Sequence, residues 1–483
     1  MANNTPDAAE PVLDIARHLK YWKMCFQAPL PHHYLSNEGN RMALAYFIIN
    51  SITILTPPPS VDNNPTQSPP LIPPEDRPKL RAWVLSHQQP GGGFAATSSL
   101  VFPTQPGAQR EPETGGREAT DGPGLANLPA TLFALQLLAM LADSEDEAGA
   151  FGGVDRVQTL RWLRRLQRAD GSFGEVLRRM PGNGWFIGGG YDMRYCYIAA
   201  SVRWTLRGDV KEGEKGWVED IDTEGLARYI LRSQTYDGGF AGSSQEEPHA
   251  GYAYCAISAL SLLDRPLTTA TPHPQTTLHS SIRDMPGLLH WLASRQFVYL
   301  EPPPTDSDAD DYEEQVNFLL PARLSDLALA TTTTPGPEGT PAPLVGCNGR
   351  ANKVADTCYT WWVGAALSIL DRGELLDWRG ARRFLLQKMA HRIGGFSKHP
   401  GGPPDVYHGC FGLTALAVMG EPGLAELDSA LAVPARTVKV IERAREALVE
   451  RGREEGKGLG REAVEMGVAM RGGRPRWLDA VGG

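Results

Sequence analysis

The sequence predicts an all-α fold, a closed α/α barrel in which inner and outer helices alternate. Two classes of helical segment support this prediction. The segments of the first class are apolar on most faces, as at 128–141, 191–206, 251–263 and 358–370. Helices of this kind are usually buried among other helices. The second class is amphipathic, as in VDRVQTLRWLRRLQ and TEGLARYILRSQ. Runs that alternate with the period of a β-strand are nearly absent.

A recurring turn joins the two classes of helix. It reads HQQPGGGF at 87–94, QRADGSFGE at 167–175, SQTYDGGFAG at 233–242 and IGGFSKHP at 393–400. Glycine supplies positive φ, aspartate turns the chain, and we expect the phenylalanine to plug the junction. Such repeats indicate helix hairpins stacked on one another, with apolar helices inside. Each inner helix begins soon after a turn, so the inner-helix N-termini should meet at one end of the barrel.

The remaining sequence is predicted to be peripheral to one catalytic domain at 1–420. Segments at about 56–78, 101–124 and 301–345 are rich in Pro, Gly, Thr and Asp, which favours exposed loops inserted between the helices. Residues 421–483 read as a C-terminal extension with one helical run, ARTVKVIERAREALVER, and a Gly-rich end.

Composition excludes several classes of protein. A hydrophobic content of 41% is too high for a disordered chain, and a net charge of −9 argues against a nucleic-acid binder. The six cysteines form no CxxC pairs, which favours a reducing compartment. No signal peptide is visible, and no run approaches the ~20 apolar residues of a membrane span. We therefore expect a cytoplasmic protein that does not span a membrane.

Three residues at the predicted inner-helix N-termini could bind zinc: Asp356, Cys358 and His408. Thiolate, imidazole and carboxylate are all good Zn²⁺ ligands, and three protein ligands leave a fourth position open, as in catalytic sites. The alternative is a buried cysteine beside a surface aspartate, and this spacing alone does not exclude it.

Two further groups lie at the same predicted end. The first could bind an anion such as a diphosphate through side-chain donors and helix N-termini, and comprises His249, Arg350, Lys353 and Tyr359. The alternative is a solvated basic edge. The second group is aromatic and could line an apolar tunnel for a hydrocarbon chain, and comprises Tyr197, Tyr252, Trp361 and Trp362. For most of these aromatic residues, ordinary barrel core is the simpler interpretation.

Four segments, GRANKVADTCYTWWVGA, PHAGYAYC, DMRYCY and IGGFSKHP…DVYHGCFGLTAL, resemble the β subunits of protein prenyltransferases. The resemblance covers about 37–420 and implies an α/α toroid. It implies that Asp356, Cys358 and His408 bind zinc, and that His249, Arg350, Lys353 and Tyr359 face the diphosphate. It places the remaining matched side chains at the border of the isoprenoid and the acceptor peptide: Arg194, Tyr252 and Trp362.

The resemblance also implies the reaction and the partners. A zinc-bound substrate thiolate attacks C1 of an isoprenoid diphosphate, and the basic pocket stabilises charge on the leaving group. The acceptor is a C-terminal C-a-a-X box, as in Rho-type small GTPases, and X = Leu or Phe typically directs geranylgeranylation. The β subunit works in a heterodimer with a helical α subunit.

Among these enzymes the sequence is most similar to geranylgeranyltransferase type I. Farnesyltransferases place Trp at the tunnel floor and type I enzymes place Thr; here the position holds Ala43, which is also small. Lys398 lies ten residues before His408, where farnesyltransferases have a Mg²⁺-binding Asp and type I enzymes have Lys, which implies that Mg²⁺ is not required. Tyr407 instead matches farnesyltransferases, so a farnesyltransferase β subunit is the alternative.

The sequence disfavours two other functions on the same barrel. Class II terpene cyclases share the barrel and use a D-x-D-D acid, and this chain contains Asp308, Asp310 and Asp311 in that spacing. A protonating aspartate needs burial to raise its pKa, and this Pro-rich acidic loop offers none. A non-catalytic scaffold on the same toroid is disfavoured because the site motifs are intact.

Overall fold

The computed structural model describes residues 10–57, 71–98, 125–180, 184–267, 276–300 and 343–454. Several sequence predictions therefore lie outside the described residues. These are the insertion at 101–124, most of those at 56–78 and 301–345, the D-x-D-D segment at 308–311, and the Gly-rich end beyond 454. None of the helices that the structure describes combines the length and the apolar character needed to cross a membrane.

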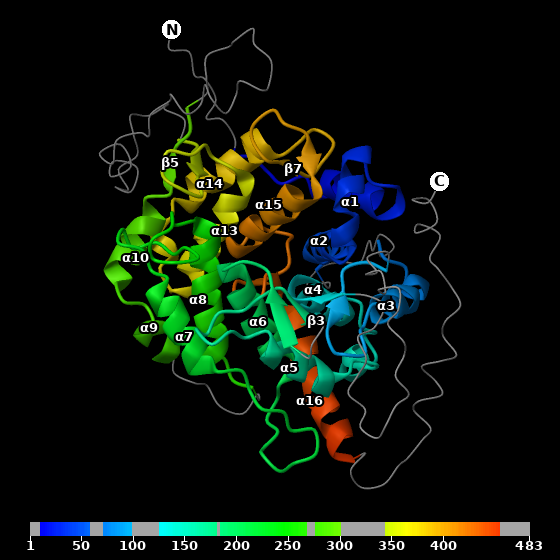
Figure 1. Cartoon of the computed structure of the whole chain (residues 1–483). Coiled ribbons are helices and arrows are strands. Elements are labelled where there is room, and N and C mark those ends of the chain that lie inside the picture. The colour runs from blue at the N-terminus through cyan, green and yellow to red at the C-terminus, as the bar shows by residue number, and fades with distance from the viewer. Residues whose placement is uncertain are drawn as a thin grey trace, which may run out of the picture.

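Six apolar helices form a closed inner ring (Figure 1). Each packs against the next, and the last returns to the first, in the order α2 (Arg41–Leu55), α4 (Leu128–Met140), α6 (Met193–Leu206), α8 (Ala250–Asp264), α13 (Thr357–Ile369) and α15 (Val406–Val418). The four inner helices expected from the apolar runs are all present, within about two residues of the expected ends. The predicted all-α toroid is confirmed.

The amphipathic helices form the outer layer: α1 (Ile15–Gln27), α3 (Arg77–Leu85), α5 (Arg156–Arg165), α7 (Thr223–Arg232), α10 (Met285–Ala293) and α14 (Trp378–Phe384). Five of them begin in the same way, with an Asp side chain that accepts the backbone N–H three residues on: Asp14, Asp155, Asp222, Asp284 and Asp377. This N-cap satisfies a backbone donor that the helix itself leaves unpaired.

Short elements complete the helical part. They are α9 (Thr276–Ser280), the 3-10 segments η1 (His32–Asn40), η2 (Pro74–Asp76), η3 (Glu147–Phe151) and η5 (Gly373–Leu375), and the π-helical turn η6 (Leu385–Met389).

The recurring turn has one geometry at all four positions. Its phenylalanine pairs with the residue six positions before it, and the ring is fully buried, at Phe94, Phe173, Phe240 and Phe396. In each turn, a glycine with positive φ lies against the backbone of the next outer helix around the ring. A Cβ on Gly171 would lie 2.0 Å from the Gly225 carbonyl oxygen, and one on Gly394 would lie 2.5 Å from that of Arg17. Glycine is therefore required for close packing as well as for backbone conformation.

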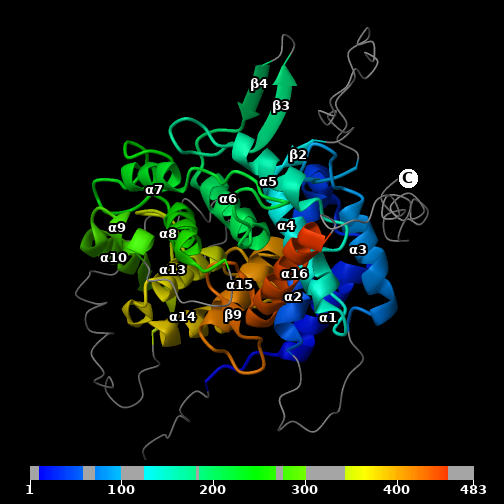
Figure 2. The ribbon, with the colours of Figure 1, turned by 90° about the horizontal axis from the view of Figure 1, so that it is seen from below.

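Short antiparallel strands edge the helices. The largest sheet has the order β1 (Phe94–Ala95), β2 (Ala126–Asn127), β3 (Val176–Met180) and β4 (Gly184–Gly188). The β3–β4 hairpin stands out from the body (Figure 2). No alternating β-type run in the sequence predicted this hairpin. Three two-stranded pairs follow: β5 (Gln296–Val298) with β6 (Val345–Cys347), β7 (Phe396–Ser397) with β8 (Pro404–Asp405), and β9 (Leu427–Asp428) with β10 (Val433–Pro434).

The chain after α15 packs against the inner helices. Carbonyl oxygens of the β9–β10 turn accept hydrogen bonds from Asn50, Gln136 and Tyr254. The helix α16 (Ala435–Glu454) follows, and the guanidinium of its buried Arg445 donates to the Trp204 carbonyl at the end of α6. This part of the extension therefore covers the end of the barrel opposite the inner-helix N-termini.

Candidate active site

The N-termini of adjacent inner helices meet at one end of the barrel, as the repeats predict. The backbone N–H of Ala250 donates to the Gly349 carbonyl, just upstream of α13, and that of Thr357 donates to the Lys398 carbonyl, upstream of α15. The four inner helices from α6 to α15 each begin with a side chain that caps the first turn: Asp192, His249, Asp356 and Asp405. Two of these capping residues are also predicted site residues.

The three predicted metal ligands come together. Asp356 is the N-cap of α13, Cys358 is its second residue, and His408 is the third residue of α15. One ligand atom from each lies within 4.8 Å of the others. The Asp356 carboxylate also accepts the Cys358 N–H at 2.8 Å and lies 3.3 Å from Nε2 of His408. Oxygen, sulfur and nitrogen donors converge on one point, which suits a tetrahedral ion with one position left open.

Protonation in this cluster follows from its charges. Burial opposes a charged His408, but the hydrogen bonds that its ring donates to the Asp356 and Asp405 carboxylates outweigh burial and raise its pKa to about 9. Burial and the neighbouring Asp356 charge raise the pKa of the Cys358 thiol well above its usual range. His408 therefore carries a proton toward Asp356, and Cys358 is a neutral thiol. A bound dication would replace the proton on Nε2 of His408 and the proton on the Cys358 sulfur.

Asp405 orients His408, and the sequence analysis did not include it among the site residues. Its carboxylate lies 2.6 Å from Nδ1 of His408 and caps α15 by accepting the backbone N–H groups of Tyr407 and His408. A carboxylate on the second ring nitrogen directs Nε2 toward the metal position. The available signal was an aspartate three residues before the histidine at a predicted helix start.

His249 and Tyr359 form the centre of the predicted anion site. Nδ1 of His249 accepts the Gly251 N–H, so Nε2 carries the hydrogen, and it lies 2.9 Å from the Tyr359 hydroxyl. Burial, followed by the charges of Arg350 and Arg194, lowers the pKa of His249 to about 4, so the ring is neutral. The Tyr359 oxygen accepts from Nε2, and its own hydrogen can therefore be donated to an anion.

Arg350 and Lys353 of the predicted anion site, and two further cations near it, are more exposed. Arg350 donates to the Glu247 carboxylate at 2.6 Å, a contact that the sequence did not predict. Lys353 is exposed in the turn before α13. Lys398 is in the turn between β7 and β8, and its charge lowers the pKa of Cys358, although burial dominates that pKa. Arg194 is held by the Asp192 carboxylate at the start of α6. Burial raises the pKa of the Tyr252 hydroxyl, and the charge of Arg194 partly opposes that rise.

Aromatic side chains from all six inner helices form a continuous series of ring contacts inside the barrel. Tyr197 contacts Tyr254, which contacts Trp362, and the series continues through the rings of Phe411, Phe47 and Phe133. Trp361 is buried beside Tyr254, and Ala43 packs against the core one turn before Phe47. Phe47, Phe133 and Phe411 were not predicted to line the barrel, because lining and core residues look alike in helices that are apolar all round.

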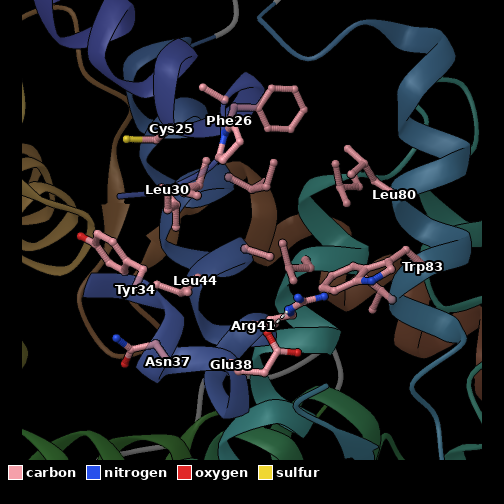
Figure 3. Close-up of a pocket in the computed structure, with 18 of the residues that line it drawn as sticks. Cys25, Phe26, Leu30, Tyr34, Asn37, Glu38, Arg41, Leu44, Leu80 and Trp83 are labelled. Carbon is pink, nitrogen blue, oxygen red and sulfur yellow. Dashed lines mark hydrogen bonds and ion pairs between the residues drawn. The ribbon is translucent and has the colours of Figure 1, made fainter. Parts of the chain in front are cut away.

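A separate cavity of about 340 Å³ lies outside the inner ring, between α2 and the outer helices α1 and α3 (Figure 3). Its walls are mainly apolar and include Leu44, Leu80 and Trp83, and the Glu38–Arg41 ion pair lies at one side. None of the predicted site residues lines it. It adjoins the start of α15 through Tyr34, whose hydroxyl accepts the Val406 N–H, and through Asn37, whose side-chain oxygen accepts from the Tyr407 hydroxyl.

Comparison with known proteins agrees with this architecture. The family described as "Prenyltransferase alpha-alpha toroid domain" matches residues 13–433. The chain belongs to this prenyltransferase family. The resemblance stated from the four sequence segments is thereby confirmed.

Two curated relatives and one solved structure are similar to most of this chain. The geranylgeranyl transferase type-1 subunit beta of Arabidopsis thaliana is 30% identical over 429 residues, which are 86% of this chain and 88% of the relative. The protein of the same name from Dictyostelium discoideum is 25% identical over 408 residues, or 82% and 89% of the two chains. The solved structure of Candida albicans protein geranylgeranyltransferase-I complexed with GGPP shares the fold, with a TM-score of 0.63, 22% identity and coverage of 90% and 99%.

Proposed function

We propose that this chain is the catalytic β subunit of a zinc-dependent protein geranylgeranyltransferase type I. The observation that carries the proposal is the arrangement at the barrel mouth. The oxygen, sulfur and nitrogen donors of Asp356, Cys358 and His408 converge beside the His249–Tyr359 pair. One group can hold a metal and the other can hold an anion, and thiol prenylation needs both.

The donor set fits zinc, with Asp356, Cys358 and His408 as the protein ligands. When bound, zinc would take the sulfur of an acceptor cysteine at its open position and lower the pKa of that thiol. The chain's own residues prepare the site. Asp405 orients the His408 ring, and the start of α13 holds Asp356 and Cys358 two positions apart.

The departing diphosphate would be stabilised by donors at the same end of the barrel. The Tyr359 hydroxyl, the Arg350 guanidinium and the Lys353 ammonium supply hydrogen bonds and positive charge where negative charge develops. We assign Lys398 the role of a fixed cation beside the diphosphate, so that Mg²⁺ is not required.

The aromatic residues inside the barrel and the prenyltransferase family indicate the substrates. The aromatic series suits a hydrocarbon chain, and small Ala43 leaves room for the twenty-carbon chain of geranylgeranyl diphosphate. Arg194, Tyr252 and Trp362 would border the lipid and the acceptor, a C-terminal C-a-a-X box such as those of Rho-type small GTPases. A farnesyltransferase β subunit remains the second candidate because of Tyr407, whose ring contacts Phe47 in the lining series.

The proposed enzyme is a cytoplasmic heterodimer with a helical α subunit. The decisive experiment incubates the α/β pair with geranylgeranyl diphosphate and a C-a-a-L peptide, and follows the peptide by mass spectrometry. We expect one geranylgeranyl group per peptide and none on a control peptide in which Ser replaces Cys. A preference for farnesyl diphosphate and C-a-a-S or C-a-a-M peptides would favour the second candidate. A stable and fully active β chain without a partner would contradict the heterodimer.

A further inference from the structure

The Arg350 guanidinium, a proposed diphosphate ligand, is engaged by a carboxylate of the same chain. Its terminal nitrogen lies 2.6 Å from Oε2 of Glu247. The two residues are 103 positions apart in the sequence. Glu247 precedes the His249 cap of α8 by two residues, and Arg350 precedes α13. Their contact therefore bridges the same pair of helix starts as the His249–Tyr359 hydrogen bond.

This ion pair sets two anions in competition for one guanidinium. A diphosphate that binds Arg350 through both terminal nitrogens must displace Glu247 or share the donors with it. A displaced Glu247 carboxylate would remain tethered beside His249 and would repel the bound diphosphate. Both effects act in the same direction, because each makes diphosphate binding weaker than it would be with a neutral side chain at position 247.

We propose that Glu247 is a positioning residue that competes with diphosphate for Arg350 and thereby weakens the binding of free diphosphate to the empty site. The inference rests on the proposed function, which supplies the diphosphate. The substrate gains additional binding energy from its hydrocarbon chain. The leaving diphosphate lacks that chain, so Glu247 helps the site to release the inorganic product while it retains the lipid substrate.

The chain offers a matched control one residue away. Glu246 is also exposed and carries the same charge, but its carboxylate lies toward Gly242, where a Cβ would be 2.6 Å from its Oε2. Among the described residues, Arg350 forms an ion pair with Glu247 and not with Glu246. The variants Glu247→Gln and Glu246→Gln remove the same unit of charge, and they differ in whether Arg350 is released.

The experiment is calorimetric titration of the zinc-loaded α/β complex with inorganic diphosphate, for wild type and both variants. The Arg350 and Glu247 side chains are 40% and 57% exposed, so the pair is a surface ion pair with a modest effect. We expect Glu247→Gln to bind diphosphate about two- to fivefold more tightly than wild type. Glu246→Gln should change much less, and the difference between the variants should shrink at high salt.

Kinetics supply a second readout that general damage to the fold would not produce. In Glu247→Gln, inorganic diphosphate should become a stronger inhibitor of transfer, and the KM for geranylgeranyl diphosphate should fall by a similar factor. Equal or weaker diphosphate binding by Glu247→Gln, or equal tightening by Glu246→Gln, would overturn the inference while leaving the proposed function intact. If wild type binds neither diphosphate nor geranylgeranyl diphosphate, the proposed function fails with it.

Discussion

The Tyr359 hydroxyl lies 2.9 Å from Nε2 of His249, although the two residues are 110 positions apart in the sequence. Each is held by the start of a different inner helix: His249 caps α8, and Tyr359 is the third residue of α13. The contact exists because those two helices are neighbours in the ring. It leaves the hydroxyl hydrogen of Tyr359 available to a negatively charged substrate.

Replacing Tyr359 with Phe should slow transfer, because it removes this donor and keeps the ring. We expect kcat to fall about tenfold, which corresponds to about 1.4 kcal/mol of transition-state stabilisation. Steady-state kinetics measure the change, and Tyr195→Phe, at a tyrosine whose hydroxyl donates to Glu175, is the control. An unchanged kcat in Tyr359→Phe would remove the hydroxyl from the mechanism.

Metal content tests the predicted ligands directly. The purified protein should hold about one zinc ion per chain, and Cys358→Ala should lose it, because two protein ligands bind zinc much less tightly than three. Cys410→Ala is the control, because Cys410 is buried on α15 and contacts Asn50. Plasma emission spectrometry after dialysis measures the ion. Full zinc content in Cys358→Ala would refute the assignment.

Lipid length should depend on position 43. The Ala43→Trp variant adds a large ring one turn before Phe47, at the proposed tunnel floor, and should shift preference from the twenty-carbon to the fifteen-carbon diphosphate. The measurement is the ratio of kcat/KM for geranylgeranyl and farnesyl diphosphate. If this ratio does not move, Ala43 is not at the end of the lipid chain.

Magnesium dependence tests the role of Lys398. Turnover should persist nearly undiminished when Mg²⁺ is removed and zinc is retained, because the Lys398 ammonium supplies the charge that Mg²⁺ would supply. Lys398→Asp should weaken activity without Mg²⁺ and create a Mg²⁺ requirement. Both proteins are titrated with Mg²⁺ at fixed Zn²⁺. A wild-type rate that rises more than about tenfold, or about 1.4 kcal/mol of barrier, would favour a farnesyltransferase.

Acid should destabilise the fold through His18. Its buried ring stacks on Phe396 and accepts the Gly395 N–H, and burial lowers its pKa from about 6.5 to about 4. Between these values the unfolded chain binds more protons than the folded one, so stability falls as pH falls. Between pH 7 and pH 5 this group alone should cost about 2 kcal/mol.

Urea denaturation of wild type and His18→Gln at the two pH values checks this. The variant should lose less stability than wild type on going to pH 5, because the other buried histidines are common to both proteins. Equal losses would show that His18 does not remain neutral in the fold.

Features that depend on neighbouring residues were readable from the sequence. The apolar runs predicted the inner helices, and the repeated Gly–Phe turn predicted their stacking, because helix periodicity and positive φ are local properties. The convergence of Asp356, Cys358 and His408 was also predictable, since all three lie at helix starts that the repeat brings to one end of the barrel. The residue types and spacing of these three side chains did not by themselves establish a zinc site. The resemblance to prenyltransferases strengthened that assignment.

Other features arose only from packing between distant segments. The Glu247–Arg350 ion pair, the Asp405 carboxylate on His408 and the aromatic series through Phe47 and Phe411 depend on which helices are neighbours and where side chains point. The β3–β4 hairpin depends on strand pairing. The position of α16 over the end of the barrel depends on its contact with α6, which the helical period of α16 does not reveal. The sequence by itself thus determined the repeating helices and the residue types at their N-termini. Tertiary structure decided which charges pair, because ion pairs and ring contacts form across space and carry no local pattern.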